Sequence, residues 1–256
     1  MTTLPGCLPA PCLHRIAHRS PPHDISHTRH PTPPHRAVWS LLCDISRKEF
    51  QKVYDRLGVR LEEFGESYYN DMIPAAIEAL AQKKLLVEDN GATIMWCGPK
   101  YQIPLMVRKS DGGYGYDSTD LAAIRYRLEK LERDWVIYIT DAGQALHFHM
   151  VFDAARLVGW AKDERHRLDH VGFGVVQGED GKRFKTRSGD TVRLVDLLDE
   201  AVQRMSASLL ERVKEGKCTL SEAEAQEAAH ALGYGAVKYA DLKQNPTTDY
   251  QFSYDR

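Results

Sequence analysis

Residues 135–159 read WVIYITDAGQALHFHMVFDAARLVG, and this stretch decides the fold class. It opens on a continuous apolar run, residues 135–139, which is typical of a strand buried in a sheet. Apolar residues then repeat at the i, i+3, i+4, i+7 spacing of a helix that ends at Gly159; they are Phe148, Val151, Phe152 and Ala155. A second apolar run, residues 171–176, predicts another core strand. The order strand, helix, strand predicts an open parallel α/β sheet, whose ligands bind beyond the carboxyl ends of the strands, here at residues 140–144 and 177–189.

The rest of the chain predicts further helices and short strands. Two amphipathic helices precede the stretch, with the same apolar spacing at Phe50, Val53, Tyr54 and Leu57 and at Ile73, Ala76, Ile77 and Leu80. Two short strands are expected at residues 93–95 and 103–107, and a helix follows with apolar positions at Leu121, Ile124, Leu128 and Leu131. Downstream, one long helical face is formed by Leu194, Leu197, Leu198, Ala201, Met205 and Leu209. Ser221 and Glu224 then offer a capping box for a last helix.

The first 36 residues differ in composition from the rest. They hold six of the eleven histidines, eight of the twelve prolines and a single acidic residue, Asp24. Prolines at this density break helices, and little apolar content remains to be buried, so we predict a disordered segment over residues 1–37 and a globular part over residues 38–256. Histidine-rich tracts can bind metals, but the irregular spacing argues against it here. The segment resembles an organellar transit peptide, or it is not a natural N-terminus, as when an intron is read through in a gene prediction.

The composition excludes several classes of protein. The 256 residues leave room for one sizeable domain, or one domain with an appendage. No stretch approaches the roughly 20 consecutive apolar residues that a membrane-spanning helix needs. The net charge of −2 gives no broad basic field, so any contact with RNA must be local or made by parts outside this chain. The five cysteines are scattered without zinc-ligand spacing, which indicates reduced thiols in a soluble intracellular protein.

The run SDGGYGYDSTDLAAI, residues 110–124, carries the most chemical information. Its glycines let the backbone turn sharply and approach a ligand closely. Tyr116 and Asp120 are four residues apart at the start of a helix, so a hydroxyl and a carboxylate can share one face and clamp a planar cation such as a guanidinium. Alternatively, Asp117, Ser118 or Asp120 only caps the helix, and spacing alone favours this second interpretation.

Two further stretches place polar groups after predicted strands. The loop GEDGKRFKTRSG, residues 178–189, can swing over a triphosphate and stabilise charge in phosphoryl or nucleotidyl transfer, although a solvated basic hairpin explains its charges as well. Its basic residues are Lys182, Arg183, Lys185 and Arg187. It is not a P-loop, because the Gly-Lys-Ser/Thr ending is missing. After residue 140, Gln144 is well placed to meet a substrate, whereas His147 and His149 are two residues apart, which argues against a metal pair.

At these residues the chain resembles the arginyl-tRNA synthetase family of eukaryotic type. The matching pieces, in family order, are DISRKEFQKVYDRLGV and GESYYND within residues 44–71, SDGGYGYDSTDLAAI, YITDAGQALHF, HVGFGVVQGEDGKRFKTRSGDTVRLVDLLDEA and GYGAVKYADLKQNPTTDYQFSYDR. Together they cover nearly everything from about residue 38 to residue 256. Several long motifs in the same order are highly specific, although no single one of them identifies the family.

The resemblance implies a class I synthetase fold with a Rossmann-like nucleotide-binding sheet. It also implies ATP-dependent, Mg²⁺-assisted activation of L-arginine, followed by transfer to arginine tRNA. By the same resemblance the arginine pocket is lined by Glu66, Tyr116, Asp120 and Gln144, which agrees with the cation clamp and overturns the capping interpretation of Asp120. Adenine would be held, largely through backbone atoms, by the strand end around His170, Gly172, Phe173, Gly174 and Val175, and His147 would also bind ATP. Lys185 and Arg187 would be catalytic residues of a mobile loop that contacts the ATP phosphates together with Ser188.

The chain departs from the family pattern in three places. Class I synthetases carry a His-x-Gly-His motif on the first strand and helix of the sheet, and neither this motif nor the asparagine-containing segment before it stands here. The sequence stops where the family's helical anticodon-binding domain begins. Ser188 occupies the place of the second lysine of Lys-Met-Ser-Lys-Ser, a change that related eukaryotic-type sequences share. We therefore expect an incomplete catalytic core that is inactive alone, with partly uncovered apolar faces on residues 135–139 and 171–176.

Two rival functions are considered beside this one. A non-catalytic synthetase remnant that acts as a binding or interaction module is favoured by the missing histidine motif. A nucleotide-dependent oxidoreductase is disfavoured, because no Gly-x-Gly-x-x-Gly follows a predicted strand. For the compartment we expect the cytoplasm, or a plastid or mitochondrion if residues 1–37 are a transit peptide.

Overall fold

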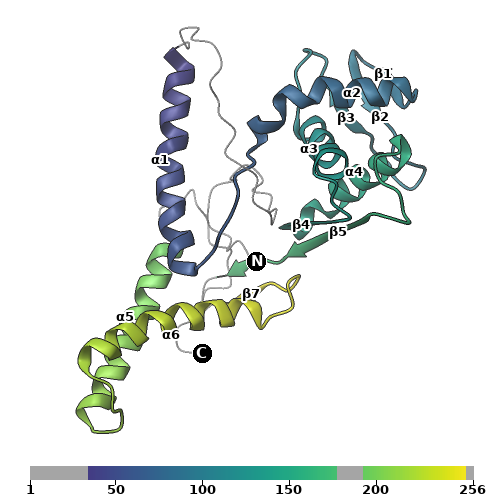
Figure 1. Ribbon diagram of the computed structural model, residues 1–256. Coiled ribbons are helices and arrows are strands. Elements are labelled where there is room, and N and C mark those ends of the chain that lie inside the picture. The colour runs from purple at the N-terminus through teal and green to yellow at the C-terminus, as the bar shows by residue number, and fades with distance from the viewer. Residues whose placement is uncertain (1–33, 178–192, 252–256) are drawn as a thin grey trace. The chain divides into compact units, whose positions relative to one another are not determined.

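The computed structural model describes residues 34–177 and 193–251 (Figure 1). The chain divides into two compact units. Of the described residues, the first unit contains 64–177 and 242–251, and the second contains 34–63 and 193–241. Within these ranges no helix combines the length and the apolar character needed to cross a lipid bilayer.

The first unit begins with helical turns and a small antiparallel sheet. A 3₁₀ helix, η1 (Glu66–Met72), leads into α2 (Ile73–Gln82). Strands β1 (Leu86–Asp89), β2 (Ala92–Met95) and β3 (Leu105–Arg108) form a sheet in this order, antiparallel throughout. The helix predicted around residues 73–80 and the strands predicted at 93–95 and 103–107 are confirmed, with strand bounds shifted by one or two residues. The short strand β1 was not predicted.

The parallel strand–helix–strand motif predicted from residues 135–176 is present. β4 (Trp135–Asp141) pairs in parallel with β5 (Arg167–Phe173). A 3₁₀ turn, η3 (Ala142–Gln144), and α4 (Ala145–Val158) connect them. The predicted end of α4 is also confirmed, because Gly159 adopts the left-handed conformation with φ 93°. The described residues thus contain a parallel strand pair with a helical connection, the unit expected in a Rossmann-like sheet.

The second strand begins and ends earlier than the predicted residues 171–176. β5 stops at Phe173, and Val176–Gln177 form a separate strand, β6, which pairs in parallel with β7 (Tyr250–Gln251). After Phe173 the chain no longer pairs with β4. The N–H of the next residue, Gly174, donates instead to the carbonyl oxygen of Pro246 at 2.7 Å. Because of this break, Gln177 ends β6 and not the strand beside β4.

One face of the β4–β5 pair is covered and the other is open in the described part of the chain. Val136 and Tyr138 are 8% and 1% exposed, and the Tyr138 ring packs against the Phe148 ring of α4 with 4.7 Å between the ring centroids. The alternate apolar residues are between 37% and 54% exposed: Trp135, Ile137, Ile139 and, on β5, Val171. The prediction of a strand buried on both faces is therefore wrong, and the expectation of uncovered apolar faces is confirmed.

α3 packs against α2, α4 and β3 in the core of the first unit. It spans Tyr116–Arg125 and continues as a π-helical turn, η2 (Tyr126–Lys130), as the apolar spacing from Leu121 predicted. α3 packs beside α4, and Leu121, Ala123 and Ile124 are fully or nearly fully buried. The π-helical turn places a charged residue, Arg127, inside this core at 3% exposure.

The described part of the second unit contains α1 (Pro34–Leu57), α5 (Leu194–Lys214) and α6 (Glu222–Leu242). α1 begins at Pro34, within the segment 1–37 that was predicted to be disordered; residues 1–33 of that segment lie outside the described part. Proline is tolerated there because the first helical N–H has no partner in any case. The predicted capping box before α6 is confirmed, since Glu224 N donates to Ser221 Oγ at 3.3 Å and Ser221 N donates to Glu224 Oε2 at 2.8 Å.

Gly233 sets the separation of α5 and α6. A Cβ atom added to it would lie 2.9 Å from the backbone nitrogen of Val202, closer than real Cβ contacts, and backbone cannot move aside easily. We expect Gly233→Ala to lower the free energy of unfolding by about 1–3 kcal/mol. Gly235, in the same helix, has nothing within 4 Å of its added Cβ, so Gly235→Ala should instead stabilise the helix by up to about 1 kcal/mol. Urea unfolding of both variants followed by circular dichroism checks this; equal effects of the same sign would contradict it.

Candidate functional site

The site begins at the N-terminus of α3, where Ser118 does the capping. The Gly115 N–H donates to Ser118 Oγ at 3.2 Å, and that hydroxyl in turn donates to the carbonyl oxygen of Val107 at 2.7 Å. Ser118 is 1% exposed, so its hydrogen bonds also tie the helix to β3. The capping interpretation therefore holds for Ser118, and Asp117 and Asp120 are engaged elsewhere.

Asp117 and Asp120 both bind the imidazole of His147 on α4. His147 Nε2 lies 2.7 Å from Asp120 Oδ2, and His147 Nδ1 lies 3.2 Å from Asp117 Oδ1. The other oxygen of Asp117 accepts the Met106 N–H at 2.5 Å. Glu66, at the start of η1, lies near enough to interact electrostatically with Asp120. We call Glu66, Asp117 and Asp120 the acidic cluster.

The acidic cluster makes His147 a cation at neutral pH. Burial alone disfavours the imidazolium, but hydrogen bonds to Asp117 and Asp120 and the charges of both raise the pKa of His147 to about 9. Because the pKa is raised in the folded state, the ion pairs stabilise the fold fully below the ordinary histidine pKa, and this contribution is lost as the pH rises through about 9. Burial, and then repulsion by Asp120, raises the pKa of Glu66.

A second cation lies beneath the acidic cluster. Arg127 donates from Nη1 to the Tyr138 hydroxyl at 2.6 Å and from Nη2 to the Tyr69 hydroxyl at 3.2 Å. Its guanidinium also lies over both rings, at 4.9 Å and 5.7 Å from their centroids. Arg127 interacts electrostatically with Asp120, which is itself only 7% exposed. A buried carboxylate therefore lies within the field of two cations of its own chain.

The other residues predicted for the arginine pocket lie near this cluster in sequence but are open to solvent. Tyr116 is the first residue of α3 and is 72% exposed, so the structure does not bring its ring together with buried Asp120 as a closed clamp. Gln144 is exposed and precedes α4 at its N-cap position. The cation on Asp120 is the imidazolium of His147, a residue that the resemblance assigned to ATP and that sequence spacing treated as structural.

The residues predicted for ATP gather at the carboxyl ends of β4 and β5. His170 Nε2 lies 2.8 Å from Thr140 Oγ1, and its ring stacks on Phe148 at 5.3 Å with 17° between the planes. Burial, followed by the charge of His149, lowers the pKa of His170, so this imidazole is neutral at neutral pH. A Cβ atom at Gly172 would lie 2.8 Å from the Ala142 backbone, so only glycine fits where β5 passes the turn after β4.

The backbone beyond β5 is already bonded within the first unit. Besides the bond from Gly174 N to Pro246, Val175 N donates to Asp249 Oδ1 at 2.6 Å, and Val175 O accepts the Tyr250 N–H at 3.1 Å. That Gly174 and Val175 hold adenine through backbone atoms stays a prediction; the N–H groups of both already have protein partners. Phe173 ends β5 and remains half-buried beside them.

The predicted catalytic loop lies outside the described residues. This applies to Lys182, Arg183, Lys185, Arg187 and Ser188. In the described part of the chain no group of three or more His, Cys, Asp or Glu side chains is arranged to hold a metal ion.

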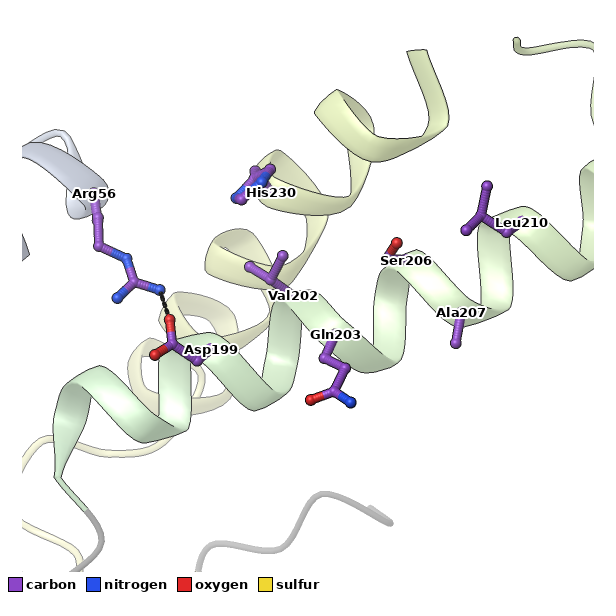
Figure 2. Close-up of a pocket in the computed structure, with 8 residues that line it drawn as sticks. All are labelled: Arg56, Asp199, Val202, Gln203, Ser206, Ala207, Leu210 and His230. Atoms are coloured by element: carbon purple, nitrogen blue, oxygen red, sulfur yellow. Dashed lines mark hydrogen bonds and ion pairs between the residues drawn. The ribbon is translucent and has the colours of Figure 1, made fainter. Parts of the chain in front are cut away.

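A hollow of about 440 Å³ lies in the second unit (Figure 2). Arg56 of α1 donates from Nη2 to Asp199 Oδ1 at 2.5 Å at one end of it, and His230 of α6 stands beside α5. The remaining lining comes from α5: Val202, Gln203, Ser206, Ala207 and Leu210. Apart from the Arg56–Asp199 ion pair, the hollow offers little charge. Ion pairs at the surface contribute little to stability. The chemistry therefore concentrates in the first unit.

Comparison with known proteins gives a consistent result. Residues 26–254 match the family described as tRNA synthetases class I (R), catalytic domain. The arginine–tRNA ligase, chloroplastic/mitochondrial, of Arabidopsis thaliana is 54% identical over 227 residues, which cover 88% of this chain and 35% of the relative. The cytoplasmic arginine–tRNA ligase of the same plant is 51% identical over 227 residues, with 88% and 38% covered.

A solved structure gives the same result for the fold. The crystal structure of arginyl-tRNA synthetase from Plasmodium falciparum superimposes with a TM-score of 0.75 and 37% sequence identity, covering 88% of this chain and 37% of that one. The chain thus spans little more than a third of the length of the relatives that it matches.

Proposed function

Because this chain belongs to the class I arginyl-tRNA synthetase catalytic-domain family, we propose that residues 38–256 form part of an arginine–tRNA ligase core that binds L-arginine at Asp120 and ATP at the ends of β4 and β5. The reaction joins arginine to tRNA in two steps, activation of the arginine carboxylate by ATP and transfer of the arginyl group to arginine tRNA. The residues that would act on each substrate follow from the geometry of the first unit.

One observation carries the arginine site: a buried carboxylate, Asp120, already holds a planar cation at 2.7 Å. A guanidinium is also a planar cation with N–H donors, and it prefers two parallel hydrogen bonds to a carboxylate. Asp117 and Glu66 add negative charge around Asp120, which favours a cationic ligand over a neutral one. Tyr116 and Gln144, both exposed, would turn toward the ligand as it binds, as interface side chains commonly do.

The ATP site is proposed at the strand ends beside His170. A neutral His170 stacked on Phe148 offers a polar edge, and Gly172 keeps the turn after β4 close to β5. Ligands of parallel α/β sheets bind at such ends. Phe173, Gly174 and Val175 would contribute backbone atoms not already bonded to the chain. His147, on α4, is proposed to contact ATP as well.

The phosphates would be held by Lys185, Arg187 and Ser188, since cationic groups stabilise charge that develops during nucleotidyl transfer. Mg²⁺ is proposed to arrive with ATP, since the described residues contain no cluster of three or more side chains that could hold it. The compartment would be the cytoplasm, or a plastid or mitochondrion if residues 1–37 are a transit peptide.

A charging assay with arginine tRNA, ATP and labelled L-arginine tests the activity, and calorimetric titration with L-arginine tests the site. Charging above the level without ATP would support the full proposal. Arginine binding without charging would support the site and favour a non-catalytic binding module for this chain. Absence of both would overturn the proposed function.

A further inference from the structure

The proposed arginine site is occupied by the protein's own cation. His147 Nε2 holds Oδ2 of Asp120 at 2.7 Å, at the short end of the range for such charge-assisted bonds. A guanidinium that binds a carboxylate in the bidentate manner needs both oxygens. Arginine and His147 therefore compete for the same oxygen atom.

We propose that His147 is an internal competitor for the arginine site: the guanidinium of arginine displaces its imidazolium from Asp120, and the displacement releases the proton of His147. This inference rests on the proposed function, because it requires that arginine binds at Asp120. It assigns His147 to arginine selection as a positioning residue, in addition to its assignment to ATP by resemblance.

The charges around His147 explain why the proton would leave. Asp117 and Asp120 of α3 hold the imidazolium, Glu66 of η1 adds negative charge near Asp120, and Arg127 of η2 adds positive charge on the buried side. A guanidinium on Asp120 takes the stronger partner away and places a new positive charge beside the ring. Burial alone already disfavours the charged imidazole, so with Asp117 as its remaining partner at 3.2 Å the ring loses its proton more readily.

Buried Asp120 also favours a charged ligand over a neutral isostere. A guanidinium restores the positive charge that Asp120 loses when His147 leaves. The urea group of citrulline has nearly the same shape but no charge, so its binding would leave Asp120 buried without a cationic partner on that side. Buried Asp120 would therefore set the difference in affinity between arginine and citrulline, because both ligands displace the same imidazolium.

Calorimetric titration of the full chain with L-arginine at pH 6.5 and pH 8.0, each in two buffers of different ionisation enthalpy, tests the exchange. In this window the α-amino group of arginine stays mostly protonated. If the pKa of His147 falls from about 9 toward its ordinary value on binding, affinity rises with pH by up to about tenfold between the two conditions. The buffer dependence of the heat should also show close to one proton released at pH 8.0.

The variants separate exchange from a merely structural role. His147→Gln keeps a hydrogen-bond donor without the charge, so it should bind arginine more tightly than wild type at pH 6.5, show no pH dependence and keep the discrimination against citrulline. A structural role predicts weaker binding at both pH values. His149→Gln, on the exposed side of the same helix, should behave as wild type. If His147→Gln fails to fold, proton release by the wild type alone decides.

Three results would be distinguishable. Arginine binding with proton release supports the exchange. Arginine binding that is independent of pH and releases no proton overturns the exchange and leaves the proposed function intact. No arginine binding at either pH overturns both.

Discussion

Asp120→Asn is expected to weaken L-arginine binding by roughly 30-fold to several thousand-fold, the range that corresponds to about 2–5 kcal/mol for truncating one partner of a buried charge pair. The substitution keeps the size of the side chain but removes its charge and makes one of its two oxygens a donor. A guanidinium would then meet a donor where it needs an acceptor. Because Asp120 is only 7% exposed, water cannot substitute for the lost interaction. Calorimetric titration at pH 8.0 measures the effect.

Asp117→Asn is the matched control. Asp117 lies one turn earlier on α3, contacts the same histidine at 3.2 Å and has a 24% exposed side chain. The side-chain oxygen of the new asparagine can still accept the Met106 N–H, so the fold should be kept. Because partly exposed charge pairs contribute roughly 0–1 kcal/mol, the loss of arginine affinity should stay below about tenfold. Equal affinities of wild type and Asp120→Asn would show that arginine does not bind at this carboxylate.

Much of the fold follows from local pattern. The period of apolar residues placed α2, α4 and α5, and the continuous apolar run placed β4, because burial on one side imposes these spacings wherever an element forms. Gly159 and the Ser221–Glu224 capping box determine helix ends through interactions between residues close together in the sequence. Such features need no knowledge of distant contacts.

The misplaced elements depend on contacts between distant segments. β5 begins at Arg167, a charged residue that no apolar pattern marks, and pairs with β4 from its first residue. It ends at Phe173 because residues 246–250 bond to the following backbone, some 70 residues further along the chain. Pattern alone could not reveal a partner that lies so far away.

The candidate site also contains residues that sequence spacing identified and residues that it missed. Tyr116 and Asp120 share a helix by spacing, yet one is 72% exposed and the other 7%, because only the second faces α4. His147 and Arg127 were missed as partners of Asp120. The first looked like an isolated histidine and the second like a surface charge in a helical period, and only the packing of α3 against α4 and the sheet brings them together. The signal that the sequence offered was Asp120 itself, an acid four residues after the start of a helix and directly before the apolar residues 121–124.

Arg127→Met is expected to lower the free energy of unfolding by about 3–5 kcal/mol, as for other buried ionic groups that lose one partner. Methionine matches much of the side-chain volume, so the loss would not come from an empty cavity. Instead, the buried hydroxyls of Tyr138 and Tyr69 lose their donor, and Asp120 loses the cation on its buried side. Urea unfolding followed by circular dichroism gives the number. Lys130→Met, at the exposed end of the same π-helical turn, should change stability by less than about 0.5 kcal/mol.

Two kinds of partner could account for the stability lost in Arg127→Met: the two tyrosine hydroxyls and the carboxylate of Asp120. Tyr138→Phe removes one hydroxyl and should cost about 1–2 kcal/mol, less than Arg127→Met. If the field of Arg127 on Asp120 provides the rest, Arg127→Met should be less destabilising when Asp120→Asn is already present, with a coupling of about 1 kcal/mol or more. Additive effects of the two changes would mean that the tyrosine hydrogen bonds account for the whole loss. In that case Arg127 would hold the core together without acting on the acidic cluster.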